Sequence, residues 1–287
     1  MRILVTGASG QLGQTIKTMA ENYPSFDFDF KSSKQLDITN EAAVAEQLQK
    51  GKYDYCINCA AYTHVDKAEQ DNVQARNVNS NGPKYLAIYC AQNKTTLFHV
   101  STDFVFDGFL NEPYREQDIA RPIGFYGDTK YKGERHIVEN LKEHFIFRTS
   151  WLYSEHGHNF LKTMMKLGKE KEELAIVYDQ VGTPTYTADL VEVMLHIMEL
   201  GSDAYGIYHY SNEGIASWYD FAKEIFELNN MAIRVKPILS AAYPTPAKRP
   251  KYSVLDKAKV KGTFGITIPY WKDSLKKAVA AAQAASV

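Results

Sequence analysis

Three glycines that directly follow the first apolar run limit the possible folds of this chain more than any other feature of its sequence. Gly7, Gly10 and Gly13 stand in the spacing G-x-x-G-x-x-G, between a predicted strand over residues 2–6 and a predicted helix over 11–21. The first glycine permits a tight turn, the second lets the backbone approach a pyrophosphate closely, and the third lets the helix pack against the strand. Because free amide groups at a helix N-terminus attract anions, we interpret this turn as a dinucleotide-binding site rather than as a chance cluster of glycines.

Strands and helices alternate through the first 150 residues. Predicted strands cover 2–6, 26–30, 53–60, 96–101 and 145–149, and predicted helices cover 11–21, 41–50, 75–92 and 126–141. This alternation and the near-continuous apolar strands favour an α/β fold of the Rossmann type, with a doubly wound parallel sheet that is buried on both faces.

The alternation weakens after residue 151, where we predict a smaller mixed α/β region. Its predicted elements are helices over 160–171, 188–199, 218–227 and 271–282 and strands over 174–177 and 205–210, followed by an alanine-rich tail. We therefore divide the chain into an NAD(P)-binding Rossmann domain over 1–150, joined by later elements that return to it, and a mainly substrate-binding region over 151–287. The boundary between them is soft.

The composition excludes several classes of protein. The 287 residues carry a net charge of −1, which gives no bulk attraction to nucleic acid or to an anionic membrane. Apolar runs are short and interrupted by charges, so we expect no transmembrane helix. Met1 leads directly into a strand, and three cysteines fit a reducing compartment, so we expect no signal peptide and a cytoplasmic protein.

Two short motifs are of kinds also found in metal sites, and we predict a metal site at neither. Cys56 and Cys59 spell C-x-x-C, but they lie in the predicted strand over 53–60, where residues three apart point to opposite faces. A redox or zinc pair needs converging sulfurs, so we assign both thiols to the core. His156 and His158 flank a glycine without a carboxylate partner, which favours a structural or solvent role.

A phenol and an ammonium share one face of the predicted helix over 126–141, because Tyr126 and Lys130 are four residues apart. A phenol with a pKa of about 10 is a poor acid at neutral pH, and a neighbouring ammonium lowers that pKa. Thr102, just past the fourth predicted strand, offers a hydroxyl to the same substrate oxygen. The pair alone is common, and it indicates a proton-transfer site only because the glycine turn and Thr102 accompany it.

The end of the second predicted strand decides between NAD and NADP. An acidic residue there would hold the ribose 2′-hydroxyl and favour NAD, whereas Lys31 and Ser32 would receive a 2′-phosphate. We favour NADPH, with NADH as the alternative if Asp29 ends the strand. We expect Asp37 and Ile38 to meet the adenine, the alternative being a surface turn before a helix cap.

A set of further segments covers essentially the whole chain: residues 5–13, 36–39, 58–63, 65–69, 101–108, 126–130, 147–153, 179–185 and 243–250. Together they resemble the extended short-chain dehydrogenase/reductase family, and within it the reductases of dTDP-4-keto sugars. The glycines and the Tyr/Lys pair are shared by many members, whereas the middle and C-terminal segments are the specific ones. The resemblance implies that NAD(P)H reduces the C4 ketone of dTDP-4-dehydro-β-L-rhamnose to dTDP-L-rhamnose, the last step of dTDP-rhamnose biosynthesis for cell-surface polysaccharides.

The resemblance also implies roles for particular residues. Tyr126 donates a proton to the ketone oxygen, Lys130 lowers the pKa of that phenol and hydrogen-bonds the nicotinamide ribose, and Thr102 positions the same oxygen. Implied cofactor contacts are Gly7, Gly10, Gln11, Leu12, Gly13, Lys31, Ser32, Asp37, Ile38, Ala60, Ala61, Tyr62, Thr63, Tyr126 and Lys130. Implied substrate contacts are Val65, Asp66, Thr102, Asp103, Trp151 over the sugar or diphosphate, Gln180, Thr183, and Arg249 at the diphosphate. Without the resemblance, Trp151 would also fit the core and Arg249 the surface.

Other functions stay open at this point. Another nucleotide-sugar reductase or a 4-epimerase of the same family would share these motifs, whereas the intact Thr102, Tyr126 and Lys130 disfavour a non-catalytic regulatory subunit. Tyr62 is larger than the residue common at its place in the family. We expect a dTDP-sugar as the substrate, and the sequence leaves open whether the chain forms a homodimer or binds Mg²⁺.

Overall fold

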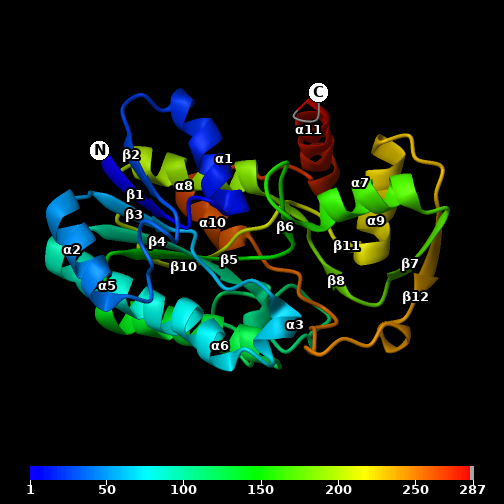
Figure 1. Cartoon of the computed structure of the whole chain (residues 1–287), viewed down its shortest axis with the longest axis horizontal. Helices are drawn as coiled ribbons and strands as arrows, with labels where there is room; N and C mark the ends of the chain where they lie inside the picture. The colour runs from blue at the N-terminus through cyan, green and yellow to red at the C-terminus, as the bar shows by residue number, and fades with distance from the viewer. Residues whose placement is uncertain (285–287) are drawn as a thin grey trace.

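The computed structural model describes residues 1–284, and its centre is a parallel sheet with the strand order β10-β5-β4-β3-β1-β2 (Figure 1). These strands are β1 (Arg2–Thr6), β2 (Asp27–Lys31), β3 (Tyr55–Asn58), β4 (Thr96–Thr102), β5 (His144–Thr149) and β10 (Gly206–His209). Each neighbouring pair is parallel, so the predicted doubly wound parallel sheet is confirmed. Because β1 lies between β2 and β3, the strand order reverses there, and ligands of such sheets bind outside the C-terminal strand ends at the reversal.

Helices cover both faces of this sheet (Figure 1). On one face lie α1 (Gln11–Met19), α8 (Thr187–Glu199) and α10 (Ala258–Phe264), and on the other lie α2 (Glu41–Gly51), α5 (Gly82–Asn93) and α6 (Phe125–Asn140). The side chains of β1 alternate between the two layers, because Ile3 and Val5 join one core cluster and Leu4 joins the other. This two-sided burial explains why the strands are apolar without alternation.

A group of shorter elements forms a second unit beside the sheet, which we call the small lobe (Figure 1). It contains α7 (Phe160–Glu170), α9 (Trp218–Leu228) and α11 (Trp271–Ala284), together with the strand pairs β7 (Glu173–Val177) with β12 (Arg234–Ile238), β6 (Leu152–Tyr153) with β9 (Thr185–Tyr186), and β8 (Val181–Gly182) with β11 (Ala216–Ser217). Tyr153, Phe221 and Trp271 are buried in its core. Between these elements the chain returns to the main sheet through α8, β10 and α10. α11 extends two residues beyond its predicted end at 282, and the rest of the predicted alanine-rich tail, residues 285–287, lies outside the described residues.

The helix predicted over 75–92 is divided in the structure. α4 (Asn72–Arg76) leads into a π-helical turn, η2 (Asn77–Asn81), and α5 then starts at Gly82. A β-carbon at residue 82 would lie 2.6 Å from Cδ1 of Ile38, so the glycine lets this side chain pack directly against the start of α5. Single π turns are often found at functional sites, and this one brings Asn79 into the interior, where its side chain is buried.

Several short elements were not predicted from the sequence. They are α3 (Val65–Ala68), η1 (Ala20–Asn22), η3 (Asp103–Val105), η4 (Ser240–Ala242), α10, β12 and the two-residue strands. β12 is largely exposed and carries Pro237 between charged and apolar residues, so it lacks the apolar alternation of a strand. Among the described residues, the helices include none that is long and apolar enough to span a membrane.

Candidate active site

The glycine turn connects β1 to α1 and packs against the residues that follow β3. Gly7 has φ of 65°, and a β-carbon on it would lie 2.5 Å from the backbone nitrogen of Ala60. A β-carbon on Gly13 would lie 2.6 Å from Cα of Ala8, so the third glycine lets α1 pack closely against the turn that follows β1. Gly10 is the N-cap of α1 and has no side chain to bond the first amides of the helix, so these amides are free for an anion.

The two other residues predicted in this turn have different surroundings. Gln11 begins α1, and its side-chain amide donates to the carbonyl of Leu152 at 3.2 Å. Leu12 is buried in the core between α1 and the sheet. Gln11 therefore ties the glycine turn to the first strand of the small lobe.

Thr102 and Tyr126 meet at the C-terminal end of the sheet. Thr102 ends β4, Tyr126 lies in the first turn of α6, and the threonine hydroxyl, which donates to the carboxylate of Asp103 at 3.1 Å, lies beside the phenol. Phe104 packs edge-on against the tyrosine ring, with 5.6 Å between centroids. The sequence prediction that these two segments converge is thus met in the structure.

Lys130 lies beneath this pair and is almost fully buried. Its Nζ atom donates to the carbonyl of Val100 at 2.7 Å and lies 3.4 Å from Nε2 of His99. Burial lowers the pKa of Lys130 to about 8, although the carboxylate of Glu134 acts in the opposite direction.

The prediction that Lys130 lowers the pKa of Tyr126 is wrong for this structure. Burial raises the pKa of Tyr126 to about 12, the neighbouring hydroxyl of Thr102 opposes this, and the nearby carboxylate of Asp103 adds to it. Lys130 is not among the groups that shift the pKa of Tyr126 here. Asp103 is itself buried, which raises its pKa to about 6, although the Thr102 hydroxyl donates to its carboxylate at 3.1 Å.

The turn after β3, which was predicted to border the cofactor, is held by a residue that sequence reasoning missed. The side chain of Asn79 accepts from the backbone N–H of Tyr62 at 2.8 Å and donates to the carbonyl of Tyr62 at 3.0 Å. The Tyr62 hydroxyl donates to Asp71 at 3.2 Å, Ala61 is partly buried, and Thr63 is exposed. The signal available in the sequence was the asparagine-rich run over 77–81 within an otherwise helical pattern.

The last residue of the second strand is a lysine, Lys31. β2 runs to Lys31, and Asp29 lies two residues inside it, so the alternative in which Asp29 ends the strand is wrong. The carboxylate of Asp29 accepts from Tyr53 and forms an ion pair of 2.9 Å with Lys31. Ser32 follows the strand, and its hydroxyl donates to Gln35 at 2.8 Å.

Asp37 and Ile38 form the turn that precedes α2. Asp37 is exposed and accepts from the backbone and hydroxyl of Thr39, at 2.9 and 2.8 Å, while Ile38 is buried. Asn40 caps α2 by accepting from the amide of Ala43 at 3.1 Å. The structure thus shows the surface turn that was weighed as the alternative, and the adenine contact stays a prediction.

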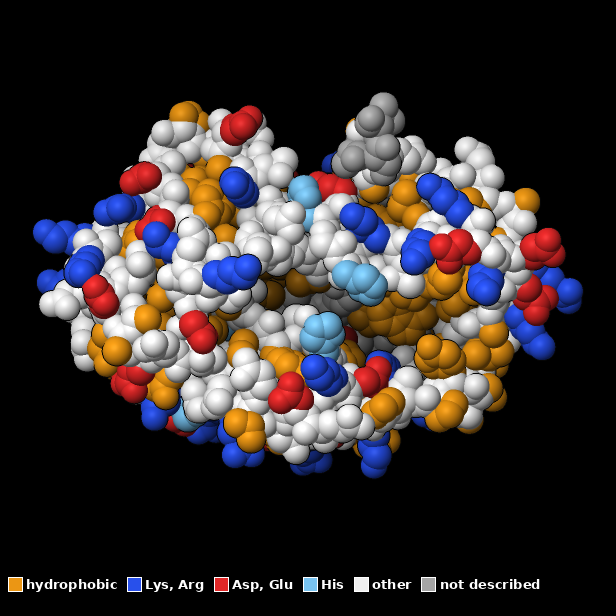
Figure 2. All heavy atoms as spheres, in the orientation of Figure 1, with side chains coloured by type: hydrophobic (Ala, Val, Ile, Leu, Met, Phe, Trp, Pro, Cys, Tyr) orange, Lys and Arg blue, Asp and Glu red, His pale blue; other side chains and the backbone are white. Residues whose placement is uncertain are grey.

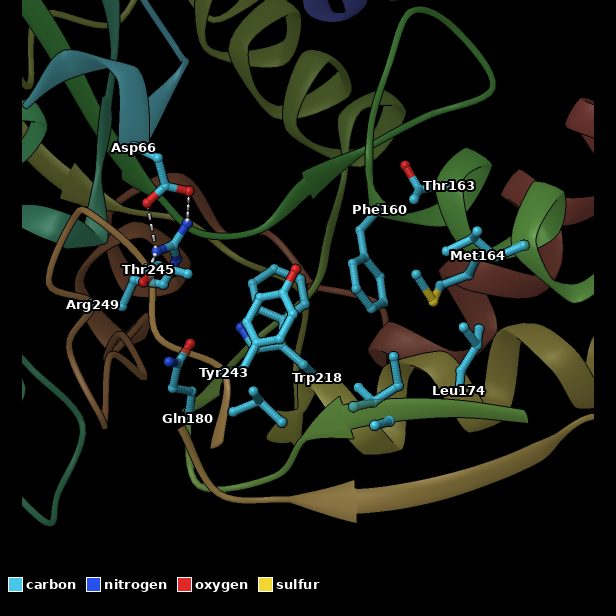
Figure 3. Close-up of a pocket in the computed structure, with 14 residues that line it drawn as sticks. Asp66, Phe160, Thr163, Met164, Leu174, Gln180, Trp218, Tyr243, Thr245 and Arg249 are labelled. Atoms are coloured by element: carbon cyan, nitrogen blue, oxygen red, sulfur yellow. Dashed lines mark hydrogen bonds and ion pairs between the residues drawn. The ribbon is translucent and has the colours of Figure 1, made fainter. Parts of the chain in front are cut away.

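A cavity of about 530 Å³ lies between α3, the small lobe and the loop over 243–250. Its lining is Asp66, Phe160, Thr163, Met164, Leu167, Leu174, Ala175, Ile176, Val177, Gln180, Trp218, Tyr243, Thr245 and Arg249 (Figure 3). In the space-filling view the middle of the molecule is hollowed, and apolar side chains form the wall toward the small lobe (Figure 2). The cavity is therefore mainly apolar, with a few polar side chains at one end.

Asp66 and Arg249 point toward one another at that polar end (Figure 3). Nη1 and Nη2 of Arg249 donate to the two carboxylate oxygens of Asp66, at 2.9 and 2.7 Å, and Nη1 also donates to Thr245 at 2.6 Å. Arg249 lowers the pKa of the Asp66 carboxyl. The bidentate pair joins α3 to the loop over 243–250, and both residues were predicted substrate contacts.

The other predicted substrate contacts are distributed unevenly around this cavity. Trp151 has a left-handed backbone with φ of 48°, and its indole stacks on Trp218 with 3.6 Å between centroids. It is Trp218, which was not predicted, that lines the cavity. Gln180 lines it too, whereas Thr183 is fully buried and donates to the carbonyl of Gly214 at 2.9 Å. Val65 begins α3 beside Asp66.

The two cysteines of the C-x-x-C motif separate into different cores. Cys56 is buried in the cluster beneath α2 and α5, whereas Cys59 packs against the cluster on the opposite face of the sheet. This confirms the predicted core assignment. His156 lies 3.3 Å from the hydroxyl of Thr18 and 3.5 Å from the carboxylate of Glu155. Within residues 1–284 no group of three or more metal-ligating side chains comes together.

Comparison with known proteins gives consistent results. The family model described as the RmlD substrate binding domain matches residues 1–284. A dTDP-4-dehydrorhamnose reductase from Aggregatibacter actinomycetemcomitans is 42% identical over 96% of this chain and 97% of its own length. The crystal structure of a dTDP-4-dehydrorhamnose reductase from Clostridium acetobutylicum superimposes with a TM-score of 0.95, at 42% identity over 99% of this chain and all of the other. That of the Bacillus anthracis enzyme in complex with NADP has a TM-score of 0.93, at 39% identity over 98% of this chain and 99% of the other.

Proposed function

Because the chain belongs to the dTDP-4-dehydrorhamnose reductase family, we propose that it reduces the C4 ketone of dTDP-4-dehydro-β-L-rhamnose to dTDP-L-rhamnose with NADPH. The observation that carries the proposed site is the meeting of the Thr102 hydroxyl with the Tyr126 phenol at the C-terminal end of β4. Two O–H groups at one point are suited to hold and to protonate a carbonyl oxygen.

The residues at the sheet reversal fit a dinucleotide. The position of a β-carbon on Gly7 is filled by the backbone of Ala60, and the free amides at the start of α1 suit a pyrophosphate. Lys31 and Ser32 follow at the end of β2, where a 2′-phosphate would be received, and Asp29 is already engaged. The NADP complex of the Bacillus anthracis relative supports NADPH, with NADH as the alternative. When bound, the nicotinamide supplies the hydride.

The electrostatics of Tyr126 suit a proton donor. With a pKa of about 12, the phenol stays protonated at neutral pH until negative charge develops on the ketone oxygen. Thr102 hydrogen-bonds the same oxygen and fixes its position. The proposed role of Lys130, whose amine lies one helical turn further along α6, is the hydrogen bond to the nicotinamide ribose.

The mainly apolar cavity suits the nucleoside end of the substrate. Aromatic side chains of Phe160, Trp218 and Tyr243 line it, and a nucleobase stacks on such surfaces. The guanidinium of Arg249 suits the diphosphate, which has the planar oxygen pairs that an arginine fork binds. In this arrangement the diphosphate replaces the carboxylate of Asp66 as the partner of Arg249.

An absorbance assay at 340 nm tests the proposed reaction. Stoichiometric consumption of NADPH with dTDP-4-dehydrorhamnose is expected, and parallel runs with NADH measure the cofactor preference. A 4-epimerase would instead retain its cofactor and show no net consumption.

The Tyr126→Phe variant tests the proposed proton donor. We expect it to bind NADPH nearly as the native enzyme does and to lose about 10²-fold or more in turnover, the usual scale for general acid catalysis. Near-normal turnover of this variant would refute the assignment.

A further inference from the structure

His99 lies in the interior of β4, fully buried, and links two parts of the site. Its Nε2 atom lies 3.4 Å from Nζ of Lys130, and its Nδ1 atom lies 3.0 Å from Nδ2 of Asn58. Asn58 ends β3, and its side chain contacts Thr6, the last residue of β1. A row of buried polar side chains from three adjacent strands therefore leads to Lys130.

The hydrogen bonds of Asn58 determine which nitrogen of the His99 ring carries a proton. Oδ1 of Asn58 accepts from the backbone N–H of Ala60 at 3.1 Å and from the hydroxyl of Thr6 at 2.7 Å. A backbone N–H can only donate, so the amide group cannot be flipped, and Nδ2 faces His99. Nδ2 must then donate to Nδ1 of His99, and a neutral imidazole with an accepting Nδ1 has its proton on Nε2. That N–H is directed at Lys130.

We propose that His99 is a positioning residue for the reductase reaction: held by Asn58 as the Nε2–H tautomer, it faces Lys130 with a donor and favours the amine over the ammonium. An ammonium has three donors and no acceptor, so a second donor gives it no hydrogen bond, whereas the lone pair of an amine accepts one. The inference rests on the proposed function, because it concerns how Lys130 serves Tyr126.

The consequence for the reaction is a mobile proton. After Tyr126 has protonated the ketone oxygen, the proton that Lys130 gives up restores the phenol. Lys130 becomes a neutral amine that the N–H of His99 stabilises, and it later regains a proton from solvent. Lys130 then takes part in proton transfer instead of acting only as a constant positive charge.

The charged and titratable groups around the pair come from α6 and β5. Glu134 on α6 favours the charged form of Lys130, but its carboxylate is also paired with Arg148 of β5 at 2.7 Å. Burial, Lys130 and His144 of β5 all hold the pKa of His99 well below its usual range, so the ring is neutral as the hydrogen bonds require.

Nitrogen-15 NMR of histidine-labelled, ligand-free protein reads the tautomer directly. The chain has eight histidines, and the signals of His99 are those that disappear in His99→Leu or, if that variant does not fold, those that respond to Asn58→Asp. We expect a protonated Nε2 and an unprotonated Nδ1 from about pH 6 to pH 8. A proton on Nδ1 in that range overturns the proposal.

The pH dependence of kcat tests the effect on Lys130. Asn58→Asp reverses the arrangement, because a carboxylate accepts the Nδ1–H and leaves Nε2 as an acceptor for the ammonium. The alkaline limb of the kcat profile should then move up by about one pH unit, which corresponds to a tenfold higher affinity of Lys130 for its proton.

A matched background separates this effect from simple charge attraction. The new carboxylate also attracts the ammonium through space, so Asn58→Asp is repeated in a His99→Leu background, where the expected displacement is less than half as large. Equal displacements in both backgrounds overturn the role of His99. Failure of the proposed function is distinguishable, because the native enzyme itself would then not consume NADPH with the 4-keto sugar, while the tautomer would be unchanged.

Discussion

Replacing Lys130 with methionine should stabilise the fold while it removes activity. The amine is almost fully buried beside β4, and burial lowers its pKa from 10.5 to about 8. A buried base with a lowered pKa means that the folded state holds the charged form less well than the unfolded chain does. Methionine has a similar length without the charge, so Lys130→Met relieves this penalty.

The size of the effect follows from the pKa values. Each pH unit of difference is worth about 1.4 kcal/mol, so the charged amine of Lys130 destabilises the fold by roughly 3 kcal/mol. The variant also loses the 2.7 Å hydrogen bond to the carbonyl of Val100, which is worth about 1 kcal/mol. We expect a net gain of about 2 kcal/mol, or about 4 °C in Tm for a chain of this size.

The sign of the pH dependence gives the sharpest assay. The penalty is fully present below about pH 8, where Lys130 is charged in both states, and it disappears as pH rises toward 10.5, where the folded state holds the neutral amine. Thermal unfolding of ligand-free protein, followed by circular dichroism from pH 7 to about pH 10, should therefore show the gain in Tm of Lys130→Met shrinking with pH.

Tyr126→Phe is the matched control, because it removes a catalytic group without removing a charge, and its Tm difference from the native enzyme should not depend on pH in this way. A Lys130→Met variant that is less stable than the native enzyme at pH 7 would refute the reasoning. So would a gain in Tm that is constant with pH.

Three further predictions concern cofactor and substrate binding. Gly7→Ala should lower NADPH affinity by roughly 10²-fold or more in a fluorescence titration, because the new β-carbon would lie 2.5 Å from the backbone of Ala60. The control is Gly265→Ala, which has nearly the same φ but open space around the β-carbon and should leave binding intact. Asp66→Asn should lower KM for the dTDP-sugar by roughly threefold to tenfold, because it weakens the competing partner of Arg249; a raised KM would show that Asp66 holds the sugar instead. Asn79→Ala should raise the Kd for NADPH by about tenfold, because it removes both hydrogen bonds that hold the turn after β3, and an unchanged Kd in calorimetry would contradict that role.

The features that could be predicted from the sequence are those with local signals. The spacing of Gly7 and Gly13 alone indicates a turn between strand and helix. Each glycine is needed because a β-carbon there would clash with backbone atoms a few residues away or just past the adjacent strand. The four-residue spacing of Tyr126 and Lys130 indicates a shared helix face for the same reason. Apolar runs without alternation indicated strands covered on both sides, and the parallel sheet follows from them.

The features that could not be predicted depend on contacts between distant residues. Asp66 and Arg249 are 183 residues apart, and their pairing arises only when the loop over 243–250 crosses α3. The π turn before α5 places the side chain of Asn79 against Tyr62, 17 residues away in sequence. The pKa of Tyr126 was predicted in the wrong direction because spacing along a helix carries no information on burial.

The position of β10 has a consequence for synthesis on the ribosome. β10 pairs with the outer edge of β5, yet the 56 residues from 150 to 205 separate them in sequence. At a translation rate of about 5–20 residues per second, that edge stays open for about 3–11 s after β5 has emerged. An unpaired parallel edge is a template for association with other chains. We therefore expect a fragment that ends at residue 150 to aggregate, and nascent chains to need protection until β10 has emerged.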